Sequence, residues 1–301
     1  MTPDVVVYLS SLQKQTPSRK VDVLNAFADG ARACGARVTI QKSYDVLPCK
    51  LAVILGWPSP SQSGPNIKLR AAVVKHQHRT NNHVMAIDAS TFKFHDNEGK
   101  YLRYSLNGVF YDTSEYANKF SNADRWNVIS RDLGLQMQPW YLDGDHILFL
   151  MQRDGGWSIK GLDPVQWALN KYHEVRRHTD RHIIIRPHPG KKIDLSIFTQ
   201  LPGVSISDSK NTSITEDLRH AKAALVFNSS SGVASILEGR ALVVDDQSSV
   251  CWNVAHHDLT GITEPKVFDR EQWIWDLAAA HWSDDESRRG LIFNKFIPYL
   301  Q

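Results

Sequence analysis

The sequence predicts an α/β protein made of two domains, each built around a mostly parallel, doubly wound β-sheet. Three observations lead to this prediction. Short runs of Val, Ile and Leu alternate with segments of helical spacing, which is typical of β-α-β units. The alternation gives way to an irregular stretch at residues 92–141 and then restarts. A length of 301 residues is enough for two domains of ordinary size.

The first half of the chain begins the alternation. Apolar runs typical of buried strands occur at residues 4–9, 38–40, 51–55 and 84–87. Residues 20–34 have apolar side chains at helical spacing and are followed by Gly35, a common helix stop. The segment at residues 66–75 predicts a second helix. Residues 92–141 follow no regular pattern, but their aromatic content argues against disorder and favours a functional loop. We expect a hinge at residues 136–140.

The second half repeats the pattern. Expected strands lie at residues 146–151, 182–186, 204–206, 224–227 and 241–244. Asp163 and Pro164 form a typical helix start, an acidic cap followed by proline, and this helix extends to about residue 178. Further helices are expected after Asp194, from Thr212 or Ser213, from Val233, and at residues 272–281 and 284–296.

These elements suggest where the domains begin and end. We expect a first Rossmann-like domain at residues 1–140 and a second at residues 141–283. A C-terminal helix at residues 284–301 is expected to pack back on the first domain. Internal repeats and low-complexity segments are absent from the sequence.

The composition is that of a globular protein, with 42% hydrophobic and 22% charged residues. No apolar run approaches the length of a membrane span, and the amino terminus lacks a signal-peptide pattern, so we expect a cytoplasmic protein. The three cysteines, Cys34, Cys49 and Cys251, are odd in number and widely spaced. Their spacing indicates neither a disulfide framework nor a zinc site.

The charge is unevenly divided along the chain. Residues 1–140 contain 17 Lys and Arg against 11 Asp and Glu, a net charge of +6, whereas the remainder has a net charge of −3. The basic excess includes Lys68, Arg70, Lys75 and Arg79, which lie in a segment at residues 66–83 almost without acids. A basic face of this kind can bind a polyanion such as nucleic acid. A solvated helix face is the simpler explanation for any one of these residues.

A strand, turn, helix and strand follow one another at residues 223–246. The turn, Asn228-Ser-Ser-Ser-Gly232, directly precedes the expected helix. Backbone N–H groups and hydroxyls at a helix amino terminus suit a phosphate group. Ser and Asn are also ordinary helix caps, so the turn alone leaves a purely structural role open.

A cationic loop follows another buried strand. Arg186-Pro-His-Pro189 continues into Gly190, Lys191 and Lys192. Because two prolines restrict the backbone around His188, its imidazole is held at the carboxyl end of the strand. Open α/β sheets bind ligands at that edge, so this loop can face the same anion as the serine turn. A proline-stiffened turn with solvated lysines is an equally simple explanation.

The ordered pair of loops carries a resemblance to a known family. Two successive Rossmann-like halves, Arg-Pro-His-Pro after a strand, and Ser-Ser-Ser-Gly followed by Glu238 and Gly239 resemble GT-B glycosyltransferases. The second half is similar to capsular-polysaccharide-type transferases and to glycosyltransferase-like proteins of bacteriophages. The resemblance covers residues 146–250, and the first half matches only as a general fold. It implies two Rossmann-like domains that face each other across a cleft.

The resemblance also implies roles for individual residues. The donor would be a nucleotide sugar, with a UDP-sugar as the leading candidate, and the transferred group a hexose or pentose. Its diphosphate would be held by the residues of the two loops, Arg186, His188, Lys191, Ser229, Ser230, Ser231 and Gly232. Glu238 matches the acidic residue that accepts hydrogen bonds from the ribose. Cations and donors aimed at a leaving diphosphate lower the barrier, since negative charge develops there.

The catalytic base is expected in the first domain. Asp88 is our candidate, because it ends an apolar strand where the cleft should lie and a base must reach the acceptor hydroxyl. Asp112, Glu115 and Asp124 lie in the irregular stretch and are rivals. No Asp-x-Asp metal motif occurs in a fitting context, so we expect no required metal.

The acceptor is the open question. Similarity to phage base-modifying transferases favours hydroxymethylated pyrimidines in DNA, in host cytoplasm if the protein is phage-encoded. Lys68, Arg70, Lys75 and Arg79 would then contact phosphates. An extruded base would stack on one of three aromatic residues, Trp57, Tyr111 or Trp126. Alternatives are a capsular or cell-surface saccharide acceptor, a sugar-nucleotide epimerase, or a non-catalytic binding module of the same fold.

Overall fold

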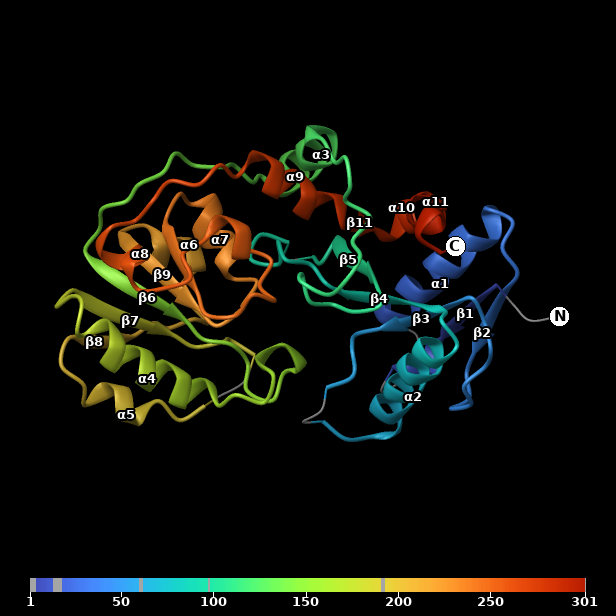
Figure 1. Cartoon of the computed structure of the whole chain (residues 1–301), viewed down its shortest axis with the longest axis horizontal. Helices are drawn as coiled ribbons and strands as arrows, with labels where there is room; N and C mark the ends of the chain where they lie inside the picture. The colour runs from blue at the N-terminus through green and yellow to red at the C-terminus, as the bar shows by residue number, and fades with distance from the viewer. Residues whose placement is uncertain (1–3, 13–17, 60–61, 97, 191–192, 301) are drawn as a thin grey trace. The chain divides into compact units, whose positions relative to one another are not determined.

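The computed structural model describes residues 4–12, 18–59, 62–96, 98–190 and 193–300 (Figure 1). The chain divides into two compact units. Unit 1 contains residues 1–109, 113–126 and 275–301, and unit 2 contains residues 110–112 and 127–274. Apart from the short segment at residues 110–112, the chain crosses between units twice, within α3 (Ala123–Leu133) and within α9 (Glu271–Ala279). Because both crossings lie inside continuous helices, no linker composition marks them, and they differ from the expected boundaries at 140 and 283.

Unit 1 is built on a six-stranded sheet with the order β11-β5-β4-β3-β1-β2. Its strands are β1 (Val5–Tyr8), β2 (Val38–Gln41), β3 (Leu51–Leu55), β4 (His83–Ala89), β5 (Tyr101–Leu106) and β11 (His281–Ser283). β1, β2, β3 and β4 pair in parallel. The four strands predicted in the first half are confirmed.

Two strands of unit 1 differ from the sequence analysis. β5 lies in the stretch predicted to be irregular and pairs antiparallel with β4, with Asp88 opposite Arg103. β11 comes from the other end of the chain and pairs antiparallel with β5. The sheet is therefore mixed rather than parallel. Arg103 and Ser105 are buried in β5, so this strand lacks the continuous apolar run on which the prediction depended.

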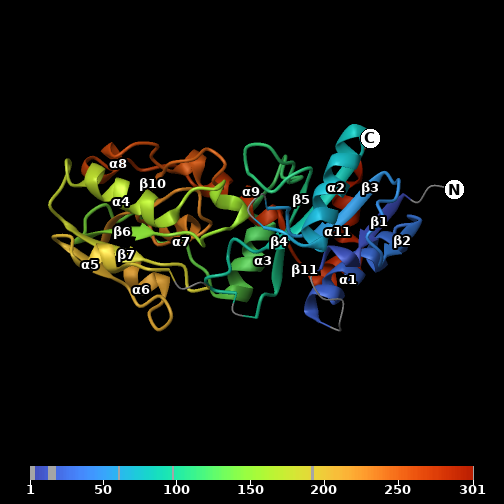
Figure 2. The ribbon, with the colours of Figure 1, turned by 90° about the horizontal axis from the view of Figure 1, so that it is seen from below.

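The core of unit 1 has two layers, one on each face of the sheet. Val5 and Val7 of β1 pack with α1 (Arg19–Ala33), whereas Val6 and Tyr8 pack with α2 (Pro65–Arg79). This division follows from the two-residue repeat of a strand, which points successive side chains to opposite faces. Figure 2 shows the two helices on opposite sides of these strands.

The carboxyl terminus of the chain belongs to unit 1. α10 (Asp284–Arg288), α11 (Leu291–Phe296) and the 3-10 helix Ile297–Tyr299 replace the single helix expected there. Gly290 separates α10 from α11 with a φ of 80°, a left-handed conformation that favours glycine. α10 and α11 both contact α1.

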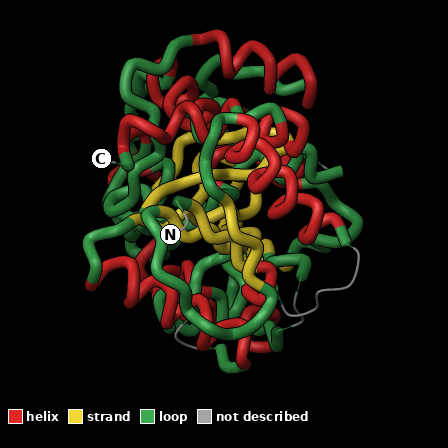
Figure 3. Tube along the Cα trace, turned by 90° about the vertical axis from the view of Figure 1, so that its right-hand side faces the viewer, coloured by secondary structure: helices red, strands yellow, loops and turns green. Residues whose placement is uncertain are grey.

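Unit 2 is built on a five-stranded, fully parallel sheet with the order β10-β9-β6-β7-β8. Its strands are β6 (His146–Leu150), β7 (His182–Arg186), β8 (Val204–Ile206), β9 (Ala221–Val226) and β10 (Ala241–Val244), all close to the predicted ranges. Almost every residue of β6, β9 and β10 is buried, as expected for strands covered on both faces. Figure 3 views the chain from the side that carries the amino terminus and colours strands yellow and helices red.

The helices of unit 2 are α4 (Pro164–Val175), α5 (Ser196–Thr199), α6 (Ile214–Leu218), α7 (Gly232–Leu237) and α8 (Thr260–Thr263), with 3-10 turns at Trp157–Ile159 and Trp252–Val254. The predicted start of α4 is confirmed, because the Asp163 carboxylate accepts hydrogen bonds from the amides of Val165 and Gln166. Ser213 and Glu216 form a capping box at the start of α6.

The strand order of unit 2 reverses beside β6. The chain adds β7 and β8 on one side of β6 and then places β9 and β10 on the other side. In open α/β sheets, ligands bind beyond the carboxyl ends of the strands at such a reversal. We call the residues that follow β6, β7, β8, β9 and β10 the carboxyl edge of unit 2. A ligand site is therefore expected at this edge.

Candidate functional site

Two buried amide side chains organise the carboxyl edge of unit 2. Gln152 follows β6 and Asn228 follows β9, and both are less than a tenth exposed. The amide N–H of Asn228 donates to Gln152 Oε1 at 3.2 Å, and Gln152 Nε2 donates to Asn228 Oδ1 at 2.8 Å. Asn228 Nδ2 donates further to the Ser158 carbonyl and the Ser248 hydroxyl. Three loops of the edge are thus joined through one asparagine.

The serine turn begins directly after Asn228. Most of the backbone amides of the turn already have hydrogen-bond partners. The amides of Gly232, Val233 and Ala234 donate to the carbonyls of the three serines before them, and the Ser231 amide donates to the Ser229 hydroxyl. The turn therefore offers few free N–H groups to an anion. Among the described residues, only the Ser229 and Ser230 amides of the turn lack a hydrogen-bond partner.

Gly232, a predicted diphosphate residue, and Glu238, a predicted ribose residue, both have structural roles in α7. Gly232 is buried, and a Cβ there would lie 2.9 Å from a Leu242 methyl and 3.3 Å from the Cys251 sulfur. Glycine is therefore needed for packing against β10. Glu238 caps the carboxyl end of α7, the opposite end from the serine turn, and is half-buried.

Tyr111 lies at this same edge, although the segments on either side of residues 110–112 belong to unit 1. Phe110–Asp112 is the part of the irregular stretch that packs with unit 2. The Tyr111 amide donates to the Ser248 carbonyl at 3.2 Å, and Ser248 accepts from Asn228. Lys160 lies 4.9 Å above the Phe110 ring and forms an ion pair with Asp246 at 2.8 Å. The structure thus brings a predicted acceptor residue close to the predicted donor turn.

His188 lines a cavity of about 340 Å³ at the ends of β7 and β8. Its Nδ1 accepts a hydrogen bond from the Gly190 amide at 2.9 Å, which orients the ring. Polar groups from Ser207 to Lys210 and apolar side chains from Ile193 and Leu195 complete the lining. The sequence analysis missed the Ser207–Lys210 segment, although its position after β8 places it at the same sheet edge. Lys191 and Lys192 lie outside the described residues.

Arg186 does not point freely toward a ligand. It is 9% exposed and forms an ion pair with Asp217. The same guanidinium donates to the Thr212 carbonyl at 2.9 Å and to the Ser207 hydroxyl at 3.3 Å. Its assignment as a diphosphate ligand conflicts with these contacts, because the charge is already neutralised inside unit 2.

Asp88 is the penultimate residue of β4 in unit 1 and pairs with Arg103 at 3.1 Å through Oδ2. The Arg103 side chain is 8% exposed and lies over the Tyr116 ring, whereas Asp88 is 19% exposed. Asp88 Oδ1 has no hydrogen-bond partner among the described residues. The ion pair thus fixes the carboxylate and leaves one oxygen available.

Three of the four predicted cations on α2 share one face. Lys68, Lys75 and Arg79 are exposed and point within about 20° of the direction of Lys68 around the helix axis, over about 16 Å. No acid of the described residues forms an ion pair with them. Arg70 differs, because it is half-buried and donates to the Leu55 carbonyl at 3.2 Å. Burial lowers the pKa of Arg70.

The two predicted tryptophan platforms of unit 1 are packed against its core. Trp126 is 9% exposed, and its ring centre lies 6.0 Å from that of Phe92. This burial is at odds with stacking on an extruded base. Trp57 is half-buried and packs against the cluster around Tyr8.

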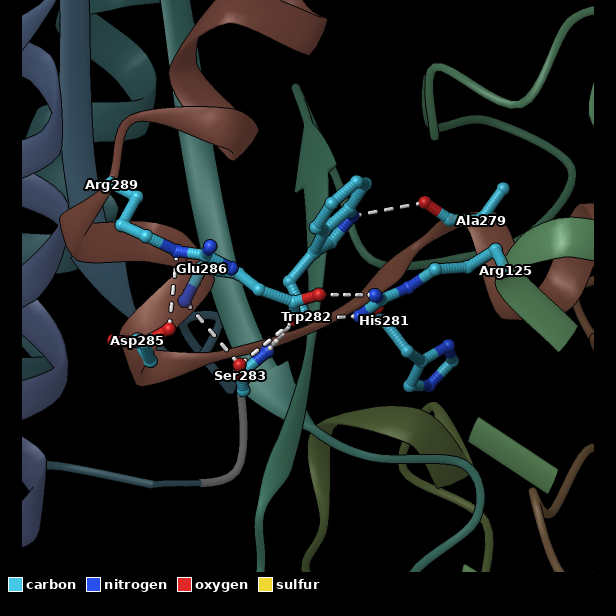
Figure 4. A network of polar contacts seen from close by, with 8 residues as sticks. All are labelled: Arg125, Ala279, His281, Trp282, Ser283, Asp285, Glu286 and Arg289. Atoms are coloured by element: carbon cyan, nitrogen blue, oxygen red, sulfur yellow. Dashed lines mark hydrogen bonds and ion pairs between the residues drawn. The ribbon is translucent and has the colours of Figure 1, made fainter. Parts of the chain in front are cut away.

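A network that the sequence analysis missed joins α3 to β11 and α10 (Figure 4). Arg125 donates to the His281 carbonyl and to both oxygens of Glu286, and it lies 4.3 Å above the Trp282 ring. His281 is fully buried, and burial lowers its pKa to about 3. Its Nε2 lies 3.0 Å from the Thr91 amide and its Nδ1 lies 2.8 Å from the Leu277 carbonyl, so the ring is a neutral Nδ1–H tautomer. This network stabilises unit 1.

The described residues contain neither a candidate metal cluster nor a candidate membrane-spanning helix. No group of three or more His, Cys, Asp or Glu residues there could hold a metal ion. In the same part of the chain, no helix combines the length and the apolar character needed to cross a membrane.

The solved structures that resemble the chain include two described as Thermosulfurimonas dismutans KpsC. The beta Kdo 2,7 transferase is 14% identical with a TM-score of 0.55, over 97% of this chain and 99% of that one. The beta Kdo 2,4 transferase is 13% identical with a TM-score of 0.58, over 93% of this chain and 90% of that one. No family model and no curated protein matches the chain.

The chain has the GT-B fold. The predicted fold class is therefore confirmed, with a mixed sheet in unit 1 and a parallel sheet in unit 2. Within this GT-B chain, unit 2 gathers His188, the Ser229 and Ser230 amides and Tyr111 at the carboxyl edge of its sheet.

Proposed function

We propose that the protein is a glycosyltransferase that moves a sugar from a nucleotide-sugar donor to an acceptor hydroxyl. The observation that carries this proposal is the cavity beside His188, at the carboxyl edge of a parallel sheet in a GT-B chain. A volume of about 340 Å³ falls within the usual range of small-ligand sites.

The donor would lie along this edge. The cavity would hold the nucleoside, because it combines apolar walls with the polar Ser207–Lys210 segment. The Ser229 and Ser230 amides would receive the diphosphate, since they lack partners among the described residues. The serine turn follows β9 and the His188 loop follows β7. Because these two strands flank β6, the two loops are about 10 Å apart, a span that a ribose and a diphosphate can cover. His188 would stabilise the charge that develops on the leaving diphosphate.

Asp88 is the proposed base. Arg103 holds one carboxylate oxygen, and the other has no partner among the described residues, so it can accept the proton of an acceptor hydroxyl. This role requires an inverting reaction, in which the hydroxyl attacks as its proton leaves. Tyr111 is proposed to contact the acceptor, because it lies two hydrogen bonds from Asn228 and the serine turn.

A saccharide acceptor fits the two similar structures, whose names describe transfer of Kdo, a sugar. Nothing in these similarities supports a hydroxymethylated pyrimidine in DNA. That second candidate depends on the exposed face of α2 formed by Lys68, Lys75 and Arg79. Transfer assays with radiolabelled donor against an oligosaccharide and against hydroxymethylated DNA separate the two acceptors.

The first test is thermal unfolding of the purified protein with UDP, CDP, CMP, GDP, ADP and their sugar conjugates. A ligand that binds only the folded state stabilises it by about 2.7 kcal/mol at a hundredfold excess over its Kd. A rise in Tm with one base supports the donor site and names the nucleotide. If neither the nucleotides nor the conjugates raise Tm, with and without saccharide or DNA present, the proposal is wrong.

A further inference from the structure

Arg186 and Asp217 are buried partners that come from different parts of unit 2. Arg186 ends β7, and Asp217 lies in α6. Their side chains are 10% and 9% exposed. Asp217 also accepts a hydrogen bond from the Ser207 hydroxyl at 2.5 Å, and its carbonyl lies 2.8 Å from His146 Nε2 of β6. The pair is therefore tied to β6, to the end of β8 and to α6.

The pair binds both ends of the loop at residues 207–213. At the start of the loop, Arg186 Nη1 donates to the Ser207 hydroxyl at 3.3 Å. At its end, Arg186 Nη2 donates to the Thr212 carbonyl at 2.9 Å. Inside the loop, Asp208 accepts from the Lys210 amide and from the Asn211 side chain, which closes a compact turn. The first anchor, Ser207, and the residues that follow it up to Lys210 line the cavity beside His188.

We infer that Arg186 and Asp217 are positioning residues that set the shape of the nucleoside cavity by holding the loop at residues 207–213. This inference rests on the proposed nucleotide-sugar site and assigns Arg186 a role different from that of a phosphate ligand. Both guanidinium NH2 groups are occupied by partners inside unit 2. If Arg186 turned from Asp217 to a phosphate, the buried Asp217 carboxylate would lose its counterion. The cost of that loss disfavours Arg186 as a phosphate ligand.

The test uses two variants and a matched control in the full-length protein. Arg186→Lys keeps the charge but loses the planar fork that reaches both ends of the loop. Asp217→Asn keeps the shape and removes the counterion. The control is Arg176→Lys, because Arg176 also binds backbone carbonyls of neighbouring loops, including Arg181 at 2.7 Å and Gly203 at 2.9 Å. These residues directly precede β7 and β8, at the opposite edge of the sheet.

The measured quantity is the Kd of each protein for UDP, CDP, GDP and ADP and for inorganic diphosphate, by calorimetry. We expect both Arg186→Lys and Asp217→Asn to bind the preferred nucleoside diphosphate roughly ten- to hundredfold more weakly. Any affinity for inorganic diphosphate should stay within about twofold, because the loop does not contact it. Arg176→Lys should bind as the wild type does. Tm values confirm that each variant is folded.

Two results would overturn the inference. If Asp217→Asn binds nucleoside diphosphates as tightly as wild type or more tightly while Arg186→Lys loses them, the freed guanidinium is a direct phosphate ligand. If both variants bind as wild type does, the loop needs no such anchor. In either case the proposed function stands, because wild-type binding is intact. Failure of the wild-type protein to bind any of these nucleotides would instead remove the nucleoside cavity and this inference together. If Arg186→Lys does not fold, the Kd values of Asp217→Asn alone test the inference.

Discussion

Gln152 and Asn228 exchange two hydrogen bonds across the ends of β6 and β9, at 2.8 and 3.2 Å. The strand order of unit 2 reverses at this pair of strands. The exchange therefore fixes the loop that follows β6 relative to the serine turn that follows β9. Because both side chains are less than a tenth exposed, neither can replace its partner with bulk water.

Substitution of this asparagine should cost stability as well as binding. Asn228→Ala removes three side-chain hydrogen bonds, which takes from the Ser158 carbonyl its donor and leaves Gln152 Nε2 and the Ser248 hydroxyl with one partner each in place of two. We expect the free energy of unfolding to fall by about 2–4 kcal/mol in urea titrations. Asn170→Ala, an exposed amide on α4, should change it by less than about 0.5 kcal/mol. Equal effects of the two substitutions would mean that the exchange contributes nothing.

The imidazole of His188 is expected to act on the donor. His188→Ala should abolish sugar transfer and the Tm rise caused by the preferred nucleotide, since the cavity loses its only described imidazole. The Tm without ligand should stay within a few degrees of wild type, because the side chain is on a loop at the surface. His178→Ala, also exposed, is the control. Normal turnover by His188→Ala would exclude the donor-site assignment.

The proposed base can be distinguished from its rivals by steady-state kinetics. Asp88→Asn should lower kcat by roughly 10²- to 10⁴-fold with little change in KM, because proton removal is lost while shape is kept. Asp112→Asn, Glu115→Gln and Asp124→Asn should retain kcat. Glu115 and Asp124 already accept hydrogen bonds from Ala117 and Asn122. A large loss in one of these three variants, with Asp88→Asn active, would move the role to that residue.

Acid should destabilise the protein partly through His281. Burial lowers its folded pKa to about 3 from an ordinary value of 6.5, so the unfolded chain binds more protons between these values. Stability from this group is complete above pH 6.5 and is lost as the pH falls toward 3. Between pH 7 and pH 4.5 the loss is roughly 2–3 kcal/mol.

His281→Asn provides the comparison, because asparagine can still donate to the Leu277 carbonyl but does not titrate. The variant should be less stable than wild type at pH 7, and the difference should shrink by roughly 2–3 kcal/mol at pH 4.5 in urea titrations. A difference that does not change with pH would show that His281 does not titrate between the two states.

The exposed face of α2 predicts salt-dependent binding of a polyanion. Replacing Lys68, Lys75 and Arg79 with Gln should weaken DNA binding and reduce the slope of log K against log salt by about 2.7, if each contacts one phosphate. Replacing Lys20, Lys93 and Lys266, which are also exposed, gives the same change in net charge as a control. Equal losses in the two triple variants would indicate a general charge effect instead of a binding face.

The sequence alone was enough for the fold class and for the strands of unit 2. Their apolar runs are continuous because both faces of a parallel sheet are covered, so burial leaves a local signal. The Asp163 cap was also predictable, because the amides that it accepts hydrogen bonds from are only two and three residues away in the sequence. The order of these elements also predicted which loops share the carboxyl edge, including those of His188 and Ser229.

Only the tertiary structure decided what each polar residue at the edge contacts. Arg186 is paired with a carboxylate 31 residues away, and Asn228 with an amide 76 residues away. β11 reaches β5 from the far end of the chain, and Tyr111 belongs to unit 2 although the segments that flank residues 110–112 belong to unit 1. Periodicity and capping report on contacts within a few residues, whereas these partners are selected by packing between distant segments. The fold was therefore predictable from local sequence patterns, whereas the contacts of the individual site residues were not predictable from them.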